Sequence, residues 1–263
     1  MSADEAVESV RRGAVLEVTI NRPKANAIDA ETSRRMGEIF ANFRDDPELR
    51  VAIITGAGER FFSAGWDLKA AAEDDVRPDD DYGVGGFGGL QELPDLNKPV
   101  IAAVNGMAVG GGFEIVLSAD LIVAADSARF CLPEINSGTV ADAATIKLPK
   151  RIPYHVAMEM LMTGRWMEAD EAKSWGLVNR VVPADELMAR AREWADELAG
   201  GPPLVFAAIK EVSRVAEARS FQDTLDRINS RELPTIATLY DSEDQLEGAR
   251  AFAEKREPVW RGR

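Results

Sequence analysis

An apolar, β-branched run that ends in a row of glycines constrains this chain more than any other stretch. Val100–Val104 stops at Asn105 and Gly106, and glycines 110–112 then lead into an amphipathic segment near Phe113. This order predicts a strand, a tight turn and a helix. Glycines at a helix start let a ligand approach the backbone, where first-turn N–H groups have no intrahelical partner. The stretch therefore predicts a backbone site suited to a developing oxyanion.

Two glutamates flank that predicted donor site. Glu114 falls in the first turn of the expected helix, and Glu134 follows a second apolar region made of residues 121–125 and 128–132. Either one alone is more often a helix-dipole residue or a solvated turn residue. Two carboxylates returned to one backbone donor site, however, suit proton transfer on either side of an enolate. The combination predicts acid–base chemistry.

Composition limits the classes of function. The 263 residues are 46% hydrophobic, enough to fill the core of one large domain. A net charge of −14, from 31 basic and 45 acidic residues, opposes binding to nucleic acid or anionic lipid. The single histidine, His155, cannot build a metal site or a histidine triad, and Cys131 in an apolar run fits a buried residue in a reducing compartment.

The N-terminal region and the apolar runs predict a cytoplasmic protein. The first ten residues are acidic and lack a signal pattern. The longest uncharged apolar stretch, residues 99–113, is broken by glycines and is shorter than the ~20 residues that a membrane span needs. We expect no membrane partner.

Three motifs at their spacing resemble the crotonase family of enoyl-CoA hydratases and isomerases. They are FFSAGWDLK at 61–69, KPVIAAVNGMAVGGGFE at 98–114 and LPE at 132–134. The segment RPKANAIDAET and the ending FAEKREPVWRGR are similar to the carnitine branch of that family. The likeness extends from about Gly13 to the C-terminus.

The resemblance implies an α/β fold, a spiral of ββα units with a helical C-terminal region. Residues 1–200 would form the crotonase core with the CoA site and the active site. Residues 201–263 would pack on neighbouring subunits in a homotrimer or a dimer of trimers. Periodicity predicts strands at 14–20, 51–55, 100–104, 121–125 and 177–182, and helices at 29–43, 90–96, 154–162, 168–175, 184–198, 204–216, 221–237 and 242–254.

The resemblance also implies roles for individual residues. Glu114 and Glu134 would be the catalytic acid/base pair, and the N–H groups of Trp66 and Gly111 would form the oxyanion hole. Residues near the CoA moiety would be Lys24, Ala25, Ala64, Asp67, Leu68, Lys69 and Lys255. Tyr82, Phe87 and Asp142 would line the acyl pocket. No metal and no separate cofactor are expected, because CoA is part of the substrate.

The implied function is a lyase that interconverts a β-hydroxyacyl-CoA thioester and its 2-enoyl-CoA. The carnitine branch favours carnitinyl-CoA and crotonobetainyl-CoA, because aromatic faces and a carboxylate suit a trimethylammonium group that cannot donate a hydrogen bond. One alternative is an ordinary short- or medium-chain enoyl-CoA hydratase or isomerase. Another is a CoA-ester-binding protein with weakened turnover, because Ala141, Ala144 and Thr145 stand where hydratases carry a proline and a glycine pair.

Overall fold

The computed structural model describes residues 3–68 and 81–263, and its larger sheet organises the fold. Six strands lie in the order β1-β2-β3-β5-β7-β10, and all neighbours are parallel except the β1–β2 pair. Their bounds are Val7–Arg12, Val15–Ile20, Val51–Gly56, Val100–Val104, Leu121–Ala125 and Arg180–Val182, respectively. All residues of β3 and β5 are buried, as expected for central strands covered on both faces.

A smaller sheet receives the strand that follows each central strand of the larger one. Its order is β4-β6-β8-β9, with bounds Phe61–Ser63, Met107–Val109, Arg129–Cys131 and Trp166–Glu168. Thus β3 leads to β4, β5 to β6 and β7 to β8, and a short helix, α4 (Gly111–Val116), follows β6. This repeated alternation between two sheets agrees with the predicted spiral of ββα units.

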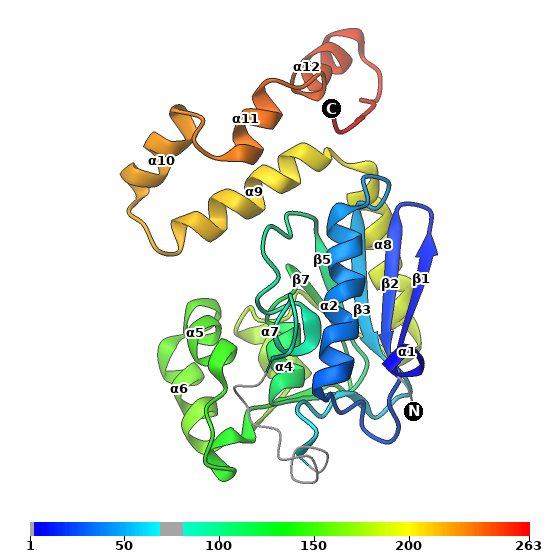
Figure 1. Ribbon diagram of the computed structural model, residues 1–263, viewed down its shortest axis with the longest axis vertical. Helices are drawn as coiled ribbons and strands as arrows, with labels where there is room; N and C mark the ends of the chain where they lie inside the picture. Colours follow the sequence, from blue (N-terminus) through cyan, green and yellow to red (C-terminus); the bar gives the residue numbers. More distant parts are fainter. Residues whose placement is uncertain (1–2, 69–80) are drawn as a thin grey trace.

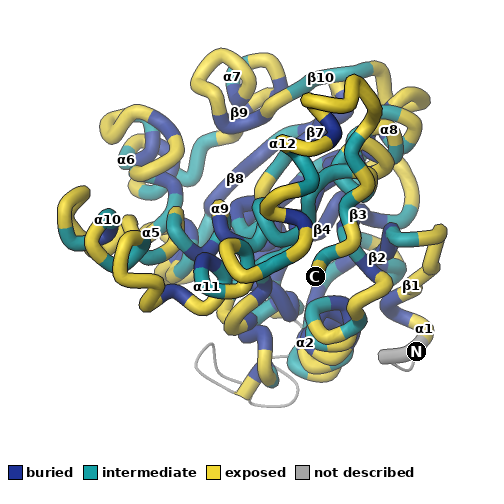
Figure 2. The backbone as a smooth tube through the Cα atoms, turned by 90° about the horizontal axis from the view of Figure 1, so that it is seen from above, coloured by how far each residue is buried: buried dark blue, intermediate teal, exposed yellow. Residues whose placement is uncertain are grey.

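Helices cover the larger sheet, as Figure 1 shows for α2 (Ala30–Asp45) in front and α8 (Leu187–Gly200) behind. α2 begins where the Asp29 side chain accepts a hydrogen bond from the N–H of Thr32 at 2.8 Å. α8 packs against β3, β5 and β7. In Figure 2 the central strands are accordingly dark, and the outer helices are largely exposed.

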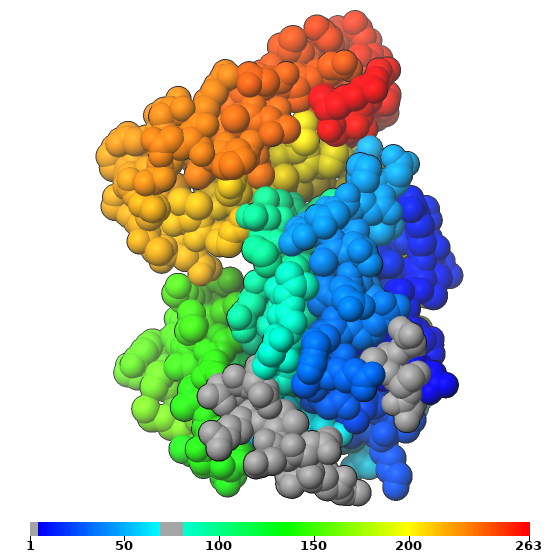
Figure 3. All heavy atoms as spheres, viewed as in Figure 1, coloured from blue at the N-terminus to red at the C-terminus, as the bar shows by residue number. Residues whose placement is uncertain are grey.

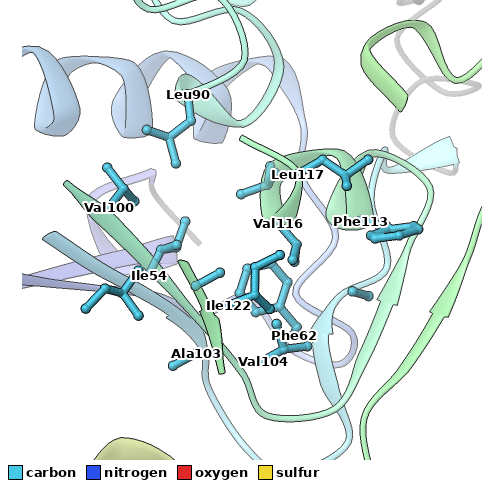
Figure 4. Packing of buried hydrophobic residues seen from close by; sticks show 14 of the residues in the cluster. Ile54, Phe62, Leu90, Val100, Ala103, Val104, Phe113, Val116, Leu117 and Ile122 are labelled. Carbon is cyan, nitrogen blue, oxygen red and sulfur yellow. The ribbon is translucent and has the colours of Figure 1, made fainter. Parts of the chain in front are cut away.

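The core fixes α4, the helix that carries Glu114. Val116 projects from α4 toward Ile122 of β7 (Figure 4), and the ring of Phe113 lies 5.0 Å from that of Phe130 in β8 of the smaller sheet. The whole helix is buried. Burial of each large apolar side chain contributes roughly 1.5–3 kcal/mol, so α4 is a rigid platform rather than a surface turn.

The remaining helices lie around this core or at one end of it. α5 (Asp142–Arg151) and α6 (Tyr154–Thr163) lie between β8 and β9 in the chain, and α7 (Ala169–Ser174) follows β9. A short helix, α1, spans Ala3–Ala6, and single helical turns stand at Phe87–Gly89, Pro133–Asn136 and Ala184–Glu186. The C-terminal helices α9 to α12, with bounds Pro203–Ala216, Phe221–Asn229, Pro234–Tyr240 and Asp244–Glu254, form the lobe at the top of Figures 1 and 3. That lobe has its own small apolar cluster of Ala208, Leu233 and Ile236.

Several sequence-based element predictions are wrong. The helix expected at 90–96 is a series of turns, in which Pro94 lacks a backbone donor and Asp95 has a positive φ of 56°. The single helix expected at 221–237 is two helices, because Pro234 starts the second one. β1 was not predicted, because its residues after Val7 are exposed and show no apolar pattern. α5 was also missed, because Pro149 interrupts its sequence.

None of the helices within residues 3–68 and 81–263 has the length and apolar character to cross a membrane.

Candidate active site

Both glutamates singled out by the sequence line one pocket with a volume of about 140 Å³. The pocket lies between the start of α4, the turn that carries Glu134, the start of α5 and the loop after residue 81. Its lining comprises Trp66, Tyr82, Phe87, Gln91, Glu92, Gly111, Glu114, Glu134, Thr139, Val140 and Asp142. The structure therefore brings together the predicted acid/base pair, the predicted oxyanion residues and the predicted acyl-pocket residues.

Close backbone packing places the N–H groups of Trp66 and Gly111 at the same pocket. A β-carbon on Gly65 would lie 2.5 Å from the carbonyl oxygen of Val109 and 2.8 Å from the nitrogen of Gly111, so only glycine allows this approach. Within the described residues, neither the Trp66 nor the Gly111 N–H donates to another backbone group. Two such donors in one pocket, one of them at a helix start, suit an oxyanion.

Glu134 lies directly beside this donor pair. A β-carbon on Gly110 would be 2.6 Å from Oε1 of Glu134, and Gly110 has a φ of 54° that favours glycine. Oε2 of Glu134 is buried and has no hydrogen-bond partner in the described part of the chain. Burial, together with the nearby charge of Glu114, raises the pKa of Glu134 from 4.5 to about 7. At neutral pH this carboxyl can therefore both hold and release a proton.

Glu114 faces the same pocket from α4, but it is held by donors. The Ala144 N–H donates to Oε1 at 2.8 Å, and the Gln91 amide is 3.4 Å from Oε2. Burial raises the pKa of Glu114, although these donors and the Ala143 N–H act in the opposite direction. The two glutamates thus differ, since one is oriented by hydrogen bonds and the other is free to meet a ligand.

An aromatic wall of Tyr82 and Phe87 lines the pocket that also holds the two glutamates. The rings of Tyr82 and Phe87 are 5.5 Å apart in an edge-to-face arrangement. The Phe87 ring lies over Gly111, where a β-carbon would approach it to 2.3 Å. Gly88 ties this loop to α2, since its N–H donates to the hydroxyl of Ser33 at 3.1 Å. The wall and the donor site are therefore in direct contact.

Only some of the residues predicted to contact CoA lie near one another. Ala25 and Ala64 are joined by a backbone hydrogen bond of 2.9 Å, next to the exposed Lys24. Asp67 pairs with Arg22 at 2.6 Å, whereas Leu68 is 57% exposed. Lys69 lies outside the described residues.

Lys255 is placed apart from these residues. It follows α12, at the opposite end of the molecule from α4 (Figure 1), and it does not line the pocket of its own chain. Its assignment to CoA stays a prediction.

The sequence reasoning missed four lining residues and one backbone donor. Gln91 and Glu92 fell in a segment expected to be helical, and Thr139 and Val140 follow the Glu134 turn. The Ala144 donor depends on α5, a helix that the sequence analysis does not predict. One feature of the sequence could have indicated them: Gln91 and Glu92 are polar residues directly after a glycine-rich stretch.

A larger cavity of about 310 Å³ lies between the core and α9, but its chemistry differs. Its cations already bond main-chain carbonyl groups: Lys98 donates to Phe43 at 2.7 Å, and Arg50 donates to Ala199 and Trp260 at 3.0 Å each. The bond from Arg50 to Trp260 joins the C-terminal end of the chain to the core, whereas Phe43 and Ala199 belong to α2 and α8. The pocket of Glu114 and Glu134 is therefore the better candidate active site.

Comparison with known proteins agrees with this geometry. A family model described as Enoyl-CoA hydratase/isomerase matches residues 11–263. Proteins described as carnitinyl-CoA dehydratase from Citrobacter koseri and Proteus mirabilis are each 57% identical to this chain over 260 residues, covering 98% of this chain and 99% of the relative. The similarity therefore extends over the pocket and the C-terminal helices alike.

Solved structures of enoyl-CoA hydratases share the fold. The enzyme from Mycobacterium tuberculosis superposes with a TM-score of 0.87 at 36% identity, covering 99% of this chain and 100% of that chain. The enzyme from Bacillus anthracis has a TM-score of 0.88 at 32% identity, covering 98% and 100%, respectively. These matches confirm the predicted fold class and the predicted family. The chain belongs to the enoyl-CoA hydratase/isomerase family, the crotonase family.

Proposed function

We propose that this chain is a CoA-thioester hydro-lyase that reversibly dehydrates a β-hydroxyacyl-CoA. The observation that carries the proposal is the meeting of Glu114 and Glu134 with the free N–H groups of Trp66 and Gly111 in one pocket. Donors at such a position stabilise negative charge on the thioester oxygen, and removal of one donor typically costs about 2.7–4 kcal/mol. Carboxylates beside them supply the proton transfers.

The chemistry balances with these groups alone. One carboxylate takes the α-proton while the two N–H groups hold the developing oxyanion. The other carboxyl protonates the β-hydroxyl, the β C–O bond breaks, and the double bond forms as water leaves. Because the two carboxyl groups interact, they titrate as a coupled pair, and we assign neither proton to one residue. The proposed reaction needs no metal and no redox cofactor, and CoA takes part only as the thioester group of the substrate.

The substrate that we propose is carnitinyl-CoA, with crotonobetainyl-CoA as product. Relatives with 57% identity are described as carnitinyl-CoA dehydratase. Trp66, Tyr82, Phe87 and Asp142 line the pocket, where they would meet the acyl end, and an aromatic face contributes roughly 0.5–2 kcal/mol to a bound cation. The structural relatives described as enoyl-CoA hydratases support the alternative, hydration of short- or medium-chain enoyl-CoA.

A CoA-ester-binding protein without turnover is less well supported. That alternative depended on Ala141, Ala144 and Thr145, which replace the proline and glycines of hydratases. Yet the Ala144 N–H is the donor that orients Glu114 at 2.8 Å. The altered segment thus supports the acid/base pair, and this favours an active enzyme.

The deciding experiment compares kcat/KM for crotonobetainyl-CoA and crotonyl-CoA, followed at the enoyl absorbance. We expect turnover of both and a preference for crotonobetainyl-CoA. A preference for crotonyl-CoA would favour the general hydratase. Tight binding of CoA esters with no rate above background would instead identify a binding protein.

Contacts to CoA and neighbouring subunits complete the proposal. Lys24 and Lys69 would meet the phosphates, and Lys255 would reach a neighbouring subunit's CoA. In the C-terminal lobe, Phe221 and Phe252 are 81% and 87% exposed, which supports packing of residues 201–263 on other subunits in a trimer or dimer of trimers. A cytoplasmic location stays a prediction.

A further inference from the structure

Two carboxylates of the pocket have no place in the acid–base scheme. Glu92 and Asp142 line the pocket together with Glu114 and Glu134, and no lysine, arginine or histidine is among the described lining residues. Across residues 3–68 and 81–263, no hydrogen bond or ion pair reaches the carboxylate of Glu92. Such a wall repels an acyl chain that ends in a negative charge and attracts one that ends in a positive charge.

A backbone hydrogen bond and contact with Gly86 place Glu92 beside the aromatic wall. The Glu92 N–H donates to the carbonyl of Gly85 at 2.9 Å. Its side chain lies flat on Gly86, where a β-carbon would be 2.5 Å from Oε1. Gly86 precedes Phe87, whose ring covers Gly111. Glu92 is exposed to solvent and lines the pocket from the same short loop that supplies the aromatic face.

Glu92 differs from Asp142 in its relation to the acid/base pair. The charge of Asp142 acts on Glu114 and raises the pKa of that carboxyl. Glu92 is not among the groups that shift the pKa of either Glu114 or Glu134. We therefore expect a substitution of Glu92 to change recognition of the acyl end and to leave proton transfer by Glu114 and Glu134 unchanged.

Resting on the proposed function, we propose that Glu92 is a specificity-determining residue whose carboxylate faces the trimethylammonium end of the acyl chain. A quaternary ammonium group cannot donate a hydrogen bond, so only a charge or an aromatic face can select it. Tyr82 and Phe87 provide the face and Glu92 provides the charge. A neutral acyl end is not attracted by the Glu92 carboxylate. The carboxylate therefore favours the cationic substrate over a neutral one.

The test compares two substrates of the same shape. One is crotonobetainyl-CoA, and the other is its carbon isostere, in which a tert-butyl group replaces the trimethylammonium group. In Glu92→Gln we expect kcat/KM for the cationic substrate to fall about tenfold, mainly through KM, and the value for the isostere to change by less than about twofold. Glu92→Asp should restore part of the preference. Glu186→Gln, an exposed carboxylate outside the pocket, is the matched control.

The outcomes separate this inference from the proposed function. A wild-type enzyme that turns over the isostere but not crotonobetainyl-CoA overturns the proposed substrate and the role of Glu92, and leaves the hydro-lyase chemistry standing. A wild-type enzyme that turns over neither substrate overturns the proposed function itself. A wild-type enzyme that prefers the cationic substrate, with the same preference in Glu92→Gln, overturns only the role of Glu92. Thermal unfolding at the wild-type temperature shows that a rate change in the variant arises in the pocket and not from misfolding.

Discussion

Carboxylates inside the pocket and carboxylates elsewhere in this acidic chain meet opposite surroundings. Outside the pocket, arginine side chains pair with them: Arg192 donates to both oxygens of Glu17 at 2.8 Å, and Arg165 lies 2.6 Å from Glu171. Those hydrogen bonds lower the pKa of Glu17 and of Glu171. In the pocket no such cation is present among the described lining residues, and burial raises the pKa of Glu114 and Glu134.

This difference separates structural carboxylates from reactive ones. A paired carboxylate stays ionised and joins two elements, as Glu17 of β2 and Arg192 of α8 do. A buried carboxyl without a cation keeps its proton to a higher pH and can exchange it near neutrality. Substitution of either kind of carboxylate, or of its partner, should therefore have different consequences for rate and for stability.

The largest effect should follow removal of a pocket carboxylate. Glu114→Gln and Glu134→Gln keep the side-chain volume but lose the titrating group, so we expect kcat to fall by about 10²–10⁴-fold in each. Single-turnover rates with the enoyl-CoA substrate measure this loss. Glu186→Gln should keep the wild-type rate. A rate near wild type in the double variant would show that the pair does not carry the chemistry.

The sequence predicted much of this site because its signals are local. Trp66, Gly111, Glu114 and Glu134 belong to short motifs in which glycines, a helix start and a Pro-Glu turn appear directly in the sequence. The structure places all four at one pocket. Their meeting follows from the ββα repeat, which the family resemblance supplied.

The parts that the sequence did not predict depend on contacts between distant segments. The Ala144 donor to Glu114 requires α5 to start beside α4, and no periodic pattern in residues 142–151 signals that helix. Gln91 and Glu92 enter the pocket because residues 90–96 turn instead of forming a helix. β1 was missed because it is an edge strand with exposed side chains. In each case tertiary packing overrides local propensity.

A structural carboxylate should respond to loss of its arginine through stability and not through rate. In Arg192→Met the carboxylate of Glu17, only 9% exposed, keeps just the weaker contact with Arg12 at 3.1 Å. We expect a loss of about 2 kcal/mol in the free energy of unfolding, with kcat/KM unchanged, measured by urea denaturation. Arg219→Met, which breaks an exposed pair with Asp223, is the control and should not change stability measurably. Equal stability of both variants would contradict the contrast.

The smallest expected effect concerns how stability changes with pH. The pKa of Glu134 is about 7 in the folded chain and 4.5 ordinarily, so its burial favours the folded state only while the carboxyl is protonated. That contribution is complete below about pH 4.5 and is lost as the pH rises through about 7. Paired carboxylates such as Glu17 act with the opposite sign, since the lowered pKa of Glu17 favours the folded state at higher pH.

Glu134→Gln isolates the pocket contribution, because the amide cannot ionise. The free energy of unfolding of the variant minus that of the wild type should be about 2 kcal/mol more favourable at pH 8 than at pH 4, because only the wild type loses the contribution of a protonated Glu134. Thermal or urea unfolding at both pH values measures the difference, and Glu186→Gln should show no such trend. If the difference between Glu134→Gln and wild type is the same at both pH values, Glu134 titrates like a solvated carboxyl. The proton-holding role that we assign to the pocket would then be lost, even if the variant is inactive.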